Sequence, residues 1–215
     1  IPIAQRGKHL VVDIHCHLNV PSAEALIRAE IANPPNPLAF MSKASMQVNA
    51  ALFGALGAKL NGVGERIADM DRLGVDVQAI SPSPGQYYYF APPELGRSAA
   101  QAVNDGIADA VAQHPDRLTG MGTVPLQNTD MAIAEMRRCV TDLGMRGIEI
   151  GTFVAGDELA ADRLRTFFAA AEELGILLFM HPLGFSHGER LAEHYLDNII
   201  GNPLESTIAL SHLVF

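Results

Sequence analysis

The sequence predicts an α/β protein in which strands and helices alternate along the chain and the strands form one parallel sheet. Short apolar runs rich in β-branched residues recur along the chain, and their continuous hydrophobicity indicates strands buried on both faces. Amphipathic stretches with helical spacing separate the runs, and a glycine ends several of these stretches just before the next run. This order is typical of repeated β–α–β units.

The first predicted strand is the run Leu-Val-Val-Asp-Ile at residues 10–14. Four further apolar runs are expected to join the same sheet, and the second of them is loosened by Gly120 and Gly122. Residues that favour β-structure dominate these runs. Their predicted ranges are 75–80, 118–124, 147–150 and 176–180.

Helices are predicted between the strands. Asn128 or Thr129 is a suitable cap for one helix, Gly144 ends it, and Gly175 ends the next. The four predicted helices span residues 65–73, 95–113, 129–143 and 161–174. Residues 21–61 do not fit the alternation, so we interpret them as an insertion that forms either a lid over the active site or a packing excursion.

The spacing of the strands predicts a larger barrel. Five strands occupy residues 10–180, and eight units at that spacing would need more than about 300 residues, within the range of (β/α)8 TIM-type barrels. The chain also stops inside an apolar element at Phe215. We therefore expect residues 1–215 to be the N-terminal part of a single barrel domain, covering about its first five βα units, with the C-terminal strands missing.

Charge and composition narrow the class of protein. The net charge is −9, with 24 acidic and 15 basic residues and no basic run, so a general nucleic-acid binder is not expected. No apolar run reaches the roughly 20 residues needed to span a bilayer. The only cysteines, Cys16 and Cys139, cannot form a disulfide framework. We expect a cytoplasmic protein with no membrane partner.

Histidines occur at the ends of the first and last predicted strands. Residues i and i+2 of an extended chain point to the same side, so His15 and His17 should face one point while Cys16 turns away. His181 follows the fifth strand, and the carboxyl ends of parallel strands open on one face of a barrel. Separately, these residues could be ordinary strand-end histidines. Together they favour a divalent metal site.

At these residues the sequence resembles a known group of proteins. The stretches Asp13-Ile14-His15-Cys16-His17 and Phe179-Met180-His181-Pro182 look like the metal-binding motifs of the amidohydrolase superfamily. The resemblance is greater to its branch of aminocarboxymuconate-semialdehyde decarboxylase and related metal-dependent decarboxylases. Further similar stretches lie at residues 68–81, 122–127 and 136–152.

The resemblance implies a (β/α)8 barrel with one divalent metal ion, zinc in the first place and manganese as the alternative. It makes His15, His17 and His181 ligands, and it places a general acid/base histidine and a fourth-ligand aspartate beyond residue 215. Two-metal members of the superfamily use a bridging lysine after strand 4, but the last lysine here is Lys59. A single ion is therefore expected, and whether Glu149 faces the barrel axis stays open.

The function that the resemblance implies is non-oxidative decarboxylation of an unsaturated or aromatic carboxylic acid by a homodimeric carboxy-lyase. The alternatives are a metal-dependent hydrolase or hydratase on the same barrel, and a metal-binding protein without activity. Of the other histidines, His212 is predicted to lie in a helix over residues 205–215, and His187 and His194 in a loop. Residues expected to contact the acid follow the second, fourth and fifth strands: Ser81, Tyr87, Thr152, Phe153 and Phe185.

Overall fold

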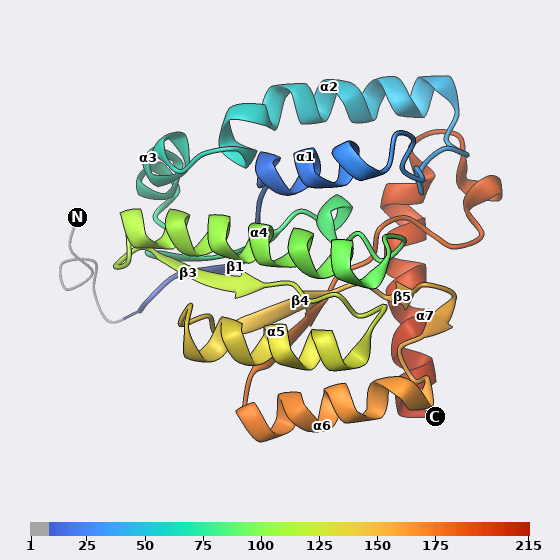
Figure 1. The fold of residues 1–215 in the computed structure, drawn as a ribbon. Coiled ribbons are helices and arrows are strands. Elements are labelled where there is room, and N and C mark those ends of the chain that lie inside the picture. Colours follow the sequence, from blue (N-terminus) through green and yellow to red (C-terminus); the bar gives the residue numbers. More distant parts are fainter. Residues whose placement is uncertain (1–8) are drawn as a thin grey trace.

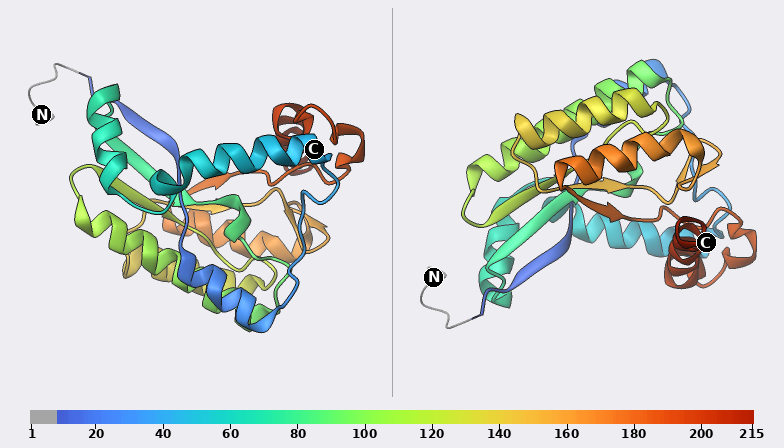
Figure 2. Two further views of the ribbon diagram at one scale, coloured as in Figure 1. Left: turned by 90° about the horizontal axis from the view of Figure 1, so that it is seen from above. Right: turned by 90° about the horizontal axis from the view of Figure 1, so that it is seen from below.

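The computed structural model describes residues 9–215, and a five-stranded parallel sheet lies at their centre (Figure 1). The strands follow one another across the sheet in chain order. The sheet is curled, so that it forms about half of a barrel wall (Figure 2). Its strands are β1 (Val12–Leu18), β2 (Val77–Pro82), β3 (Leu118–Gly122), β4 (Gly147–Ile150) and β7 (Leu177–Met180).

Helices follow the strands as the sequence predicts, and the outer face of the sheet is covered by α4 (Pro93–Gln113), α5 (Thr129–Thr141) and α6 (Arg165–Leu174) (Figure 1). Gly74 and Gly175 end two helices with left-handed φ angles of 76° and 61°, which glycine adopts without steric cost. No helix in the described part of the chain is both long and apolar enough to cross a bilayer. The two other helices outside the segment 21–61 are α3 (Gly64–Leu73), which precedes β2, and α7 (Asn202–Val214), which is the last helix of the described residues.

The core lies between the sheet and these outer helices. Its largest side chains are almost completely removed from solvent, among them Ile80, Ile107, Met136, Ile148 and Phe167. Ile80 and Ile148 come from strands and the other three from helices, as packing of a helical layer on a sheet requires. This packing supports the sheet from its outer face and so positions the ends of its strands.

Two strands extend beyond their predicted ends. β1 runs on to Leu18 and β2 to Pro82, because the parallel ladder between them continues through the pair His17–Ser81. The prediction of strand 1 at residues 10–14 was therefore too short, since it followed apolar residues only. His15 and His17 lie within β1 rather than after it. An irregular register between Asp13 and Cys16 interrupts the ladder on the way.

The segment 21–61 contains two helices with different roles. In α1 (Pro21–Glu30), Ala23 and Ile27 are buried, so this helix is part of the packing. In α2 (Lys43–Leu60), only Ser45 is buried. The carbonyl oxygen of Leu60, at the end of α2, accepts a hydrogen bond from the residue after β1.

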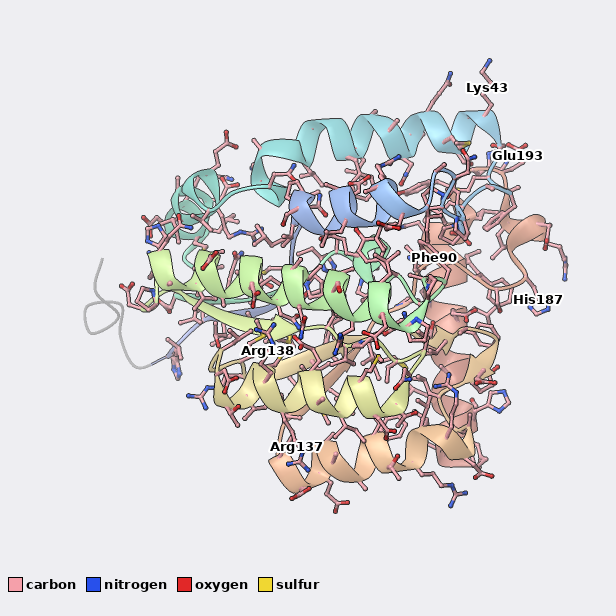
Figure 3. All side chains as sticks on the ribbon, in the orientation of Figure 1. Lys43, Phe90, Arg137, Arg138, His187 and Glu193 are labelled. Carbon is pink, nitrogen blue, oxygen red and sulfur yellow. The ribbon has the colours of Figure 1, made fainter. Side chains whose placement is uncertain are left out.

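The start of α2 is fastened to the loop that follows β7. The hydroxyl of Ser45 donates to the carbonyl oxygen of Ala192 at 2.8 Å, and the Tyr195 hydroxyl donates to Asn49 at 2.9 Å. Lys43 and Glu193 mark the two segments in Figure 3. Helix α2 therefore connects the carboxyl ends of β1 and β7, the two edge strands of the sheet.

The remaining elements are short. Ala155 and Gly156, with φ angles of 53° and 99°, make the tight turn of a hairpin that the sequence analysis did not predict. The hairpin strands are β5 (Phe153–Val154) and β6 (Asp157–Glu158). Single helical turns occur at Pro84–Gln86, Asp162–Leu164 and Gly188–Leu191, and a π-helical turn at Asp197–Gly201.

Candidate metal centre

Three histidine rings meet at the carboxyl ends of the two edge strands. His15 and His17 extend from β1, and His181 follows β7. The ring centroids lie 5.0 Å apart for His15 and His17, 5.0 Å for His15 and His181, and 4.9 Å for His17 and His181. One nitrogen from each ring lies within 4.8 Å of the other two. The curl of the sheet brings these residues together from opposite ends of the sequence.

Backbone carbonyls fix the rings of His17 and His181. Nδ1 of His17 lies 2.9 Å from the carbonyl oxygen of Pro82, and Nδ1 of His181 lies 2.6 Å from that of Pro182. A carbonyl oxygen only accepts, so both Nδ1 atoms carry the hydrogen. Nε2 of each ring keeps a free lone pair, which is the form that binds a metal.

The spacing of the nitrogens suits a metal ion. Nε2 of His15 and Nε2 of His17 are 3.2 Å apart. Tetrahedral coordination with zinc–nitrogen bonds of about 2.05 Å requires ligand atoms about 3.3 Å apart. Imidazole nitrogens are ligands for both zinc and manganese. The chemistry and geometry of the three residues therefore fit a divalent ion.

Burial favours the neutral, ligating form of two of these histidines. Desolvation and the neighbouring His181 lower the pKa of His17 to about 4. Desolvation also lowers the pKa of His181. Cys16 points to the other side of β1, where it is buried, and desolvation raises the pKa of its thiol to about 12. The thiol is therefore neutral and turned away from the histidines, as the alternation along the strand predicts.

A buried carboxylate lies behind His17. Glu149, in the middle of β4, is inaccessible to solvent, and its Oε2 is 3.7 Å from Nδ1 of His17. Oε1 accepts a hydrogen bond of 2.5 Å from the hydroxyl of Tyr87. Burial raises the pKa of Glu149 to about 7, an effect that the hydroxyls of Ser81 and Tyr87 partly offset. The structure answers the open question of the sequence: Glu149 faces the barrel interior.

Arg66 is a residue of the site that the sequence did not single out. It lies in the helix predicted over residues 65–73, but it is buried and its guanidinium donates to the carbonyl oxygens of His17 and Lys59 at 2.6 and 2.9 Å. It also donates to Gln78, which in turn donates to Asp13. Arg66 therefore ties the ends of β1 and α2 together.

The five residues expected to contact a substrate occupy different surroundings. Ser81 is buried, and its hydroxyl lies 3.2 Å from Nδ1 of His17. Tyr87 is also buried, and its hydroxyl lies 3.4 Å from the carbonyl oxygen of His181. Thr152 is buried just after β4, whereas Phe153 lies in the β5–β6 hairpin with 41% of its surface exposed. Phe185 lies in the loop after β7, its ring 6.0 Å from that of His187.

The other histidines stand apart from this group. His212 lies on α7, as the sequence predicts for this residue, and its Nε2 is 3.6 Å from Glu158. His187 is exposed in the loop after β7 and extends from the edge of the molecule in Figure 3. His194 is in the same loop and has a left-handed φ of 57°. His9 and His114 are not on the strand ends that carry the site.

Comparison with known proteins gives a consistent group of relatives. The sequence profile of the family described as Amidohydrolase matches residues 12–202. The chain is 34% identical over 173 residues to 2-amino-3-carboxymuconate-6-semialdehyde decarboxylase of Dictyostelium discoideum, covering 80% of this chain and 48% of that protein. It is 29% identical over 126 residues to gamma-resorcylate decarboxylase of Rhodococcus jostii, covering 54% and 38%. The chain thus spans about half the length, or less, of these curated relatives.

A solved structure shows the same fold. The 5-carboxyvanillate decarboxylase of Novosphingobium aromaticivorans, complexed with manganese and 4-hydroxy-3-methoxy-5-nitrobenzoic acid, superimposes with a TM-score of 0.77 at 25% identity. The match covers 96% of this chain and 60% of that one. The curled five-stranded sheet therefore corresponds to part of the barrel of that protein, which holds a divalent metal ion.

Proposed function

Because this chain belongs to the amidohydrolase family, we propose that the protein is a metal-dependent carboxy-lyase that decarboxylates an unsaturated or aromatic carboxylic acid without oxidation. One observation carries the proposal: His15, His17 and His181 converge at the carboxyl ends of parallel strands, the place where barrel enzymes hold their active sites. The relatives named above are decarboxylases, and this supports the choice of reaction.

In this proposal the three histidines hold the ion. A bound ion would supply a Lewis acid that stabilises negative charge on the substrate. Residues of this chain prepare the ligands: the carbonyl oxygens of Pro82 and Pro182 keep Nε2 of His17 and His181 free. We assign substrate contacts to Ser81, Tyr87, Thr152, Phe153 and Phe185. Following the family resemblance, the proton donor and the aspartate ligand lie outside residues 1–215.

The test uses the natural full-length protein and a panel of acids. Three candidates follow from the relatives: 2-amino-3-carboxymuconate-6-semialdehyde, gamma-resorcylate and 5-carboxyvanillate. Release of carbon dioxide together with loss of the substrate's ultraviolet absorbance supports decarboxylation, and a His181→Ala variant provides the control. Conversion without carbon dioxide would instead support the hydrolase or hydratase alternative, in which the ion activates a bound water.

The proposal also covers the identity of the metal ion, the oligomeric state, the compartment and the place of the chain in the barrel. We infer one zinc ion per chain, with manganese as the alternative, and elemental analysis distinguishes them. We also infer a homodimer in the cytoplasm. The cysteines Cys16 and Cys139, free and buried, are consistent with a reducing compartment. Light scattering and cell fractionation test these two inferences. The share of the relatives' length that the chain spans supports our assignment of residues 1–215 to the N-terminal part of one barrel domain.

A further inference from the structure

An oxygen of the buried Glu149 carboxylate has no hydrogen-bond partner in residues 9–215. Oε1 accepts from Tyr87, but no donor reaches the buried Oε2 in hydrogen-bonding geometry; the Ser81 hydroxyl acts on the carboxyl only by lowering its pKa, and Nδ1 of His17 lies 3.7 Å from Oε2. A buried carboxylate oxygen without a donor costs free energy. An aliphatic side chain at this position of β4 would avoid that cost. The carboxylate at this position therefore calls for an explanation from function.

Tyr87 holds the carboxylate in place. Its ring stacks on that of Tyr89, with centroids 5.5 Å apart and planes 14° from parallel. Tyr89 is itself fixed, because its hydroxyl accepts a hydrogen bond of 3.1 Å from the backbone N–H of Gly151. With the ring of Tyr87 immobile, its hydroxyl bond to Oε1 keeps Oε2 directed at His17.

Glu149 stands behind the ligand ring rather than beside the ion. Oε2 approaches Nδ1, whereas the face shared with His15 is formed by Nε2, on the other side of the imidazole. The nitrogens that can meet at one ion come from His15, His17 and His181. Glu149 is thus placed to act on the ion through His17.

We propose that Tyr87 and Glu149 are a positioning pair that holds a negative charge behind the ring of His17 and so increases the affinity of the centre for its metal ion. The inference rests on the metal centre proposed above. The carbonyl oxygen of Pro82 already accepts the Nδ1 hydrogen of His17, and a carboxylate 3.7 Å from the same nitrogen makes the ring a better electron donor through its charge. In the poorly solvated interior, the negative charge also attracts the cation more strongly than it would in water.

Four variants of the natural full-length protein test the pair. Glu149→Gln keeps the shape but removes the charge, and Tyr87→Phe removes the hydroxyl that holds Oε1. The double variant asks whether both act by one route. Tyr88→Phe is the matched control, because it also loses one buried tyrosine hydroxyl, but that hydroxyl contacts Gln86 and has no bond to Glu149. The measurements are the zinc dissociation constant, by competition with a chromogenic chelator, and the visible spectrum of the cobalt-substituted protein.

Removal of such a carboxylate typically weakens metal binding by about 10–100-fold, and we expect an increase of this size in the dissociation constant of Glu149→Gln. Tyr87→Phe should weaken binding in the same direction and shift the cobalt spectrum. The double variant should be no weaker than Glu149→Gln alone. Tyr88→Phe should keep the wild-type affinity and spectrum, even if its melting temperature falls.

The outcomes separate this inference from the proposed function. Wild-type protein that binds no divalent ion would overturn both. Wild-type protein that binds zinc, with an unchanged dissociation constant in Glu149→Gln, would overturn the positioning pair alone. If Glu149→Gln does not fold, Tyr87→Phe decides in its place. Equal losses of affinity in Tyr87→Phe and Tyr88→Phe would show a general packing effect and would also overturn the inference.

Discussion

Replacement of His181 by alanine should abolish metal binding while the fold is retained. The change removes one of three nitrogens that meet within 4.8 Å and leaves His15 and His17. The side chain lies at the open ends of the strands rather than between the sheet and the helices. Its bond to the carbonyl oxygen of Pro182 is within the same loop. We therefore expect the metal-free variant to lose only about 1 kcal/mol of stability.

The expected shift in melting temperature follows from linkage. An ion at 100 times its dissociation constant stabilises the folded protein by about 2.7 kcal/mol. For a protein of this size, 1 kcal/mol corresponds to about 2–4 °C, so zinc should raise the wild-type melting temperature by roughly 5–10 °C. Loss of a direct ligand should weaken binding by at least the ~100-fold upper range of an indirect contact. The same zinc concentration should then stabilise His181→Ala by no more than about 0.4 kcal/mol, or about 1 °C.

Differential scanning calorimetry with and without zinc, together with elemental analysis, checks this prediction. His212→Ala is the matched control, since it removes an imidazole on α7 whose side chain is 52% exposed and pairs only loosely with Glu158 at 3.6 Å. It should keep the ion and the full zinc-induced shift. If His212→Ala lost the ion and His181→Ala retained it, the assignment of the ligand after β7 would be wrong.

Three further predictions concern stoichiometry, packing and pH. Elemental analysis of the natural full-length protein should find about one divalent ion per chain, and two ions would show that a bridging lysine is dispensable. A Cβ at Gly122 would lie 2.8 Å from Sγ of Cys139, so Gly122→Ala should lower the free energy of unfolding by about 1–3 kcal/mol in chemical denaturation. Gly57→Ala is the control: a Cβ there meets open space on α2, and the free energy of unfolding should rise by about 0.5–1 kcal/mol. Equal effects of the two substitutions would contradict the packing described. Burial raises the pKa of Glu149 from 4.5 to about 7, so between these pH values the folded state binds a proton that the unfolded state has released. As the pH rises through this range, the free energy of unfolding of the metal-free wild type should fall by up to about 3 kcal/mol relative to Glu149→Gln. The comparison with this variant cancels the opposite contribution of His17, whose pKa is lowered to about 4, and a pH-independent difference would refute the raised pKa.

The order and type of the main elements could be predicted from the sequence, because each strand is an almost continuous apolar run between amphipathic helices. The ends of β1 could not. Its apolar run stops at Ile14, yet the strand continues through His15 and His17 to Leu18. Hydrogen bonding to β2 extends the strand, and an apolar pattern contains no information on that partner. The i, i+2 spacing of the histidines still placed both on the same side.

Residues that support the site were harder to predict than the candidate ligands. All four positions of β4 are buried, so Glu149 cannot be assigned to one face from an alternation of polar and apolar residues. The sequence does contain one signal for a special role of Glu149: it is an acidic residue within the otherwise apolar run Gly-Ile-Glu-Ile. Arg66 is similarly hidden in an amphipathic helix, and only the fold shows that its guanidinium reaches the carbonyl oxygen of His17.

The run Tyr87-Tyr88-Tyr89 shows why the arrangement of the residues behind the metal ligands depends on loop conformation. Three identical residues offer no pattern that distinguishes them, and the sequence left open whether they line a pocket or pack. The left-handed φ of 52° at Tyr88 directs its hydroxyl toward Gln86, which donates to it at 3.4 Å and is bound to the residue before α1. Tyr87 and Tyr89 can then stack in parallel and reach the end of β4. The metal ligands follow from strand ends, which a sequence shows, whereas the position of Tyr87 next to Glu149 depends on a backbone angle in a loop, which it does not show.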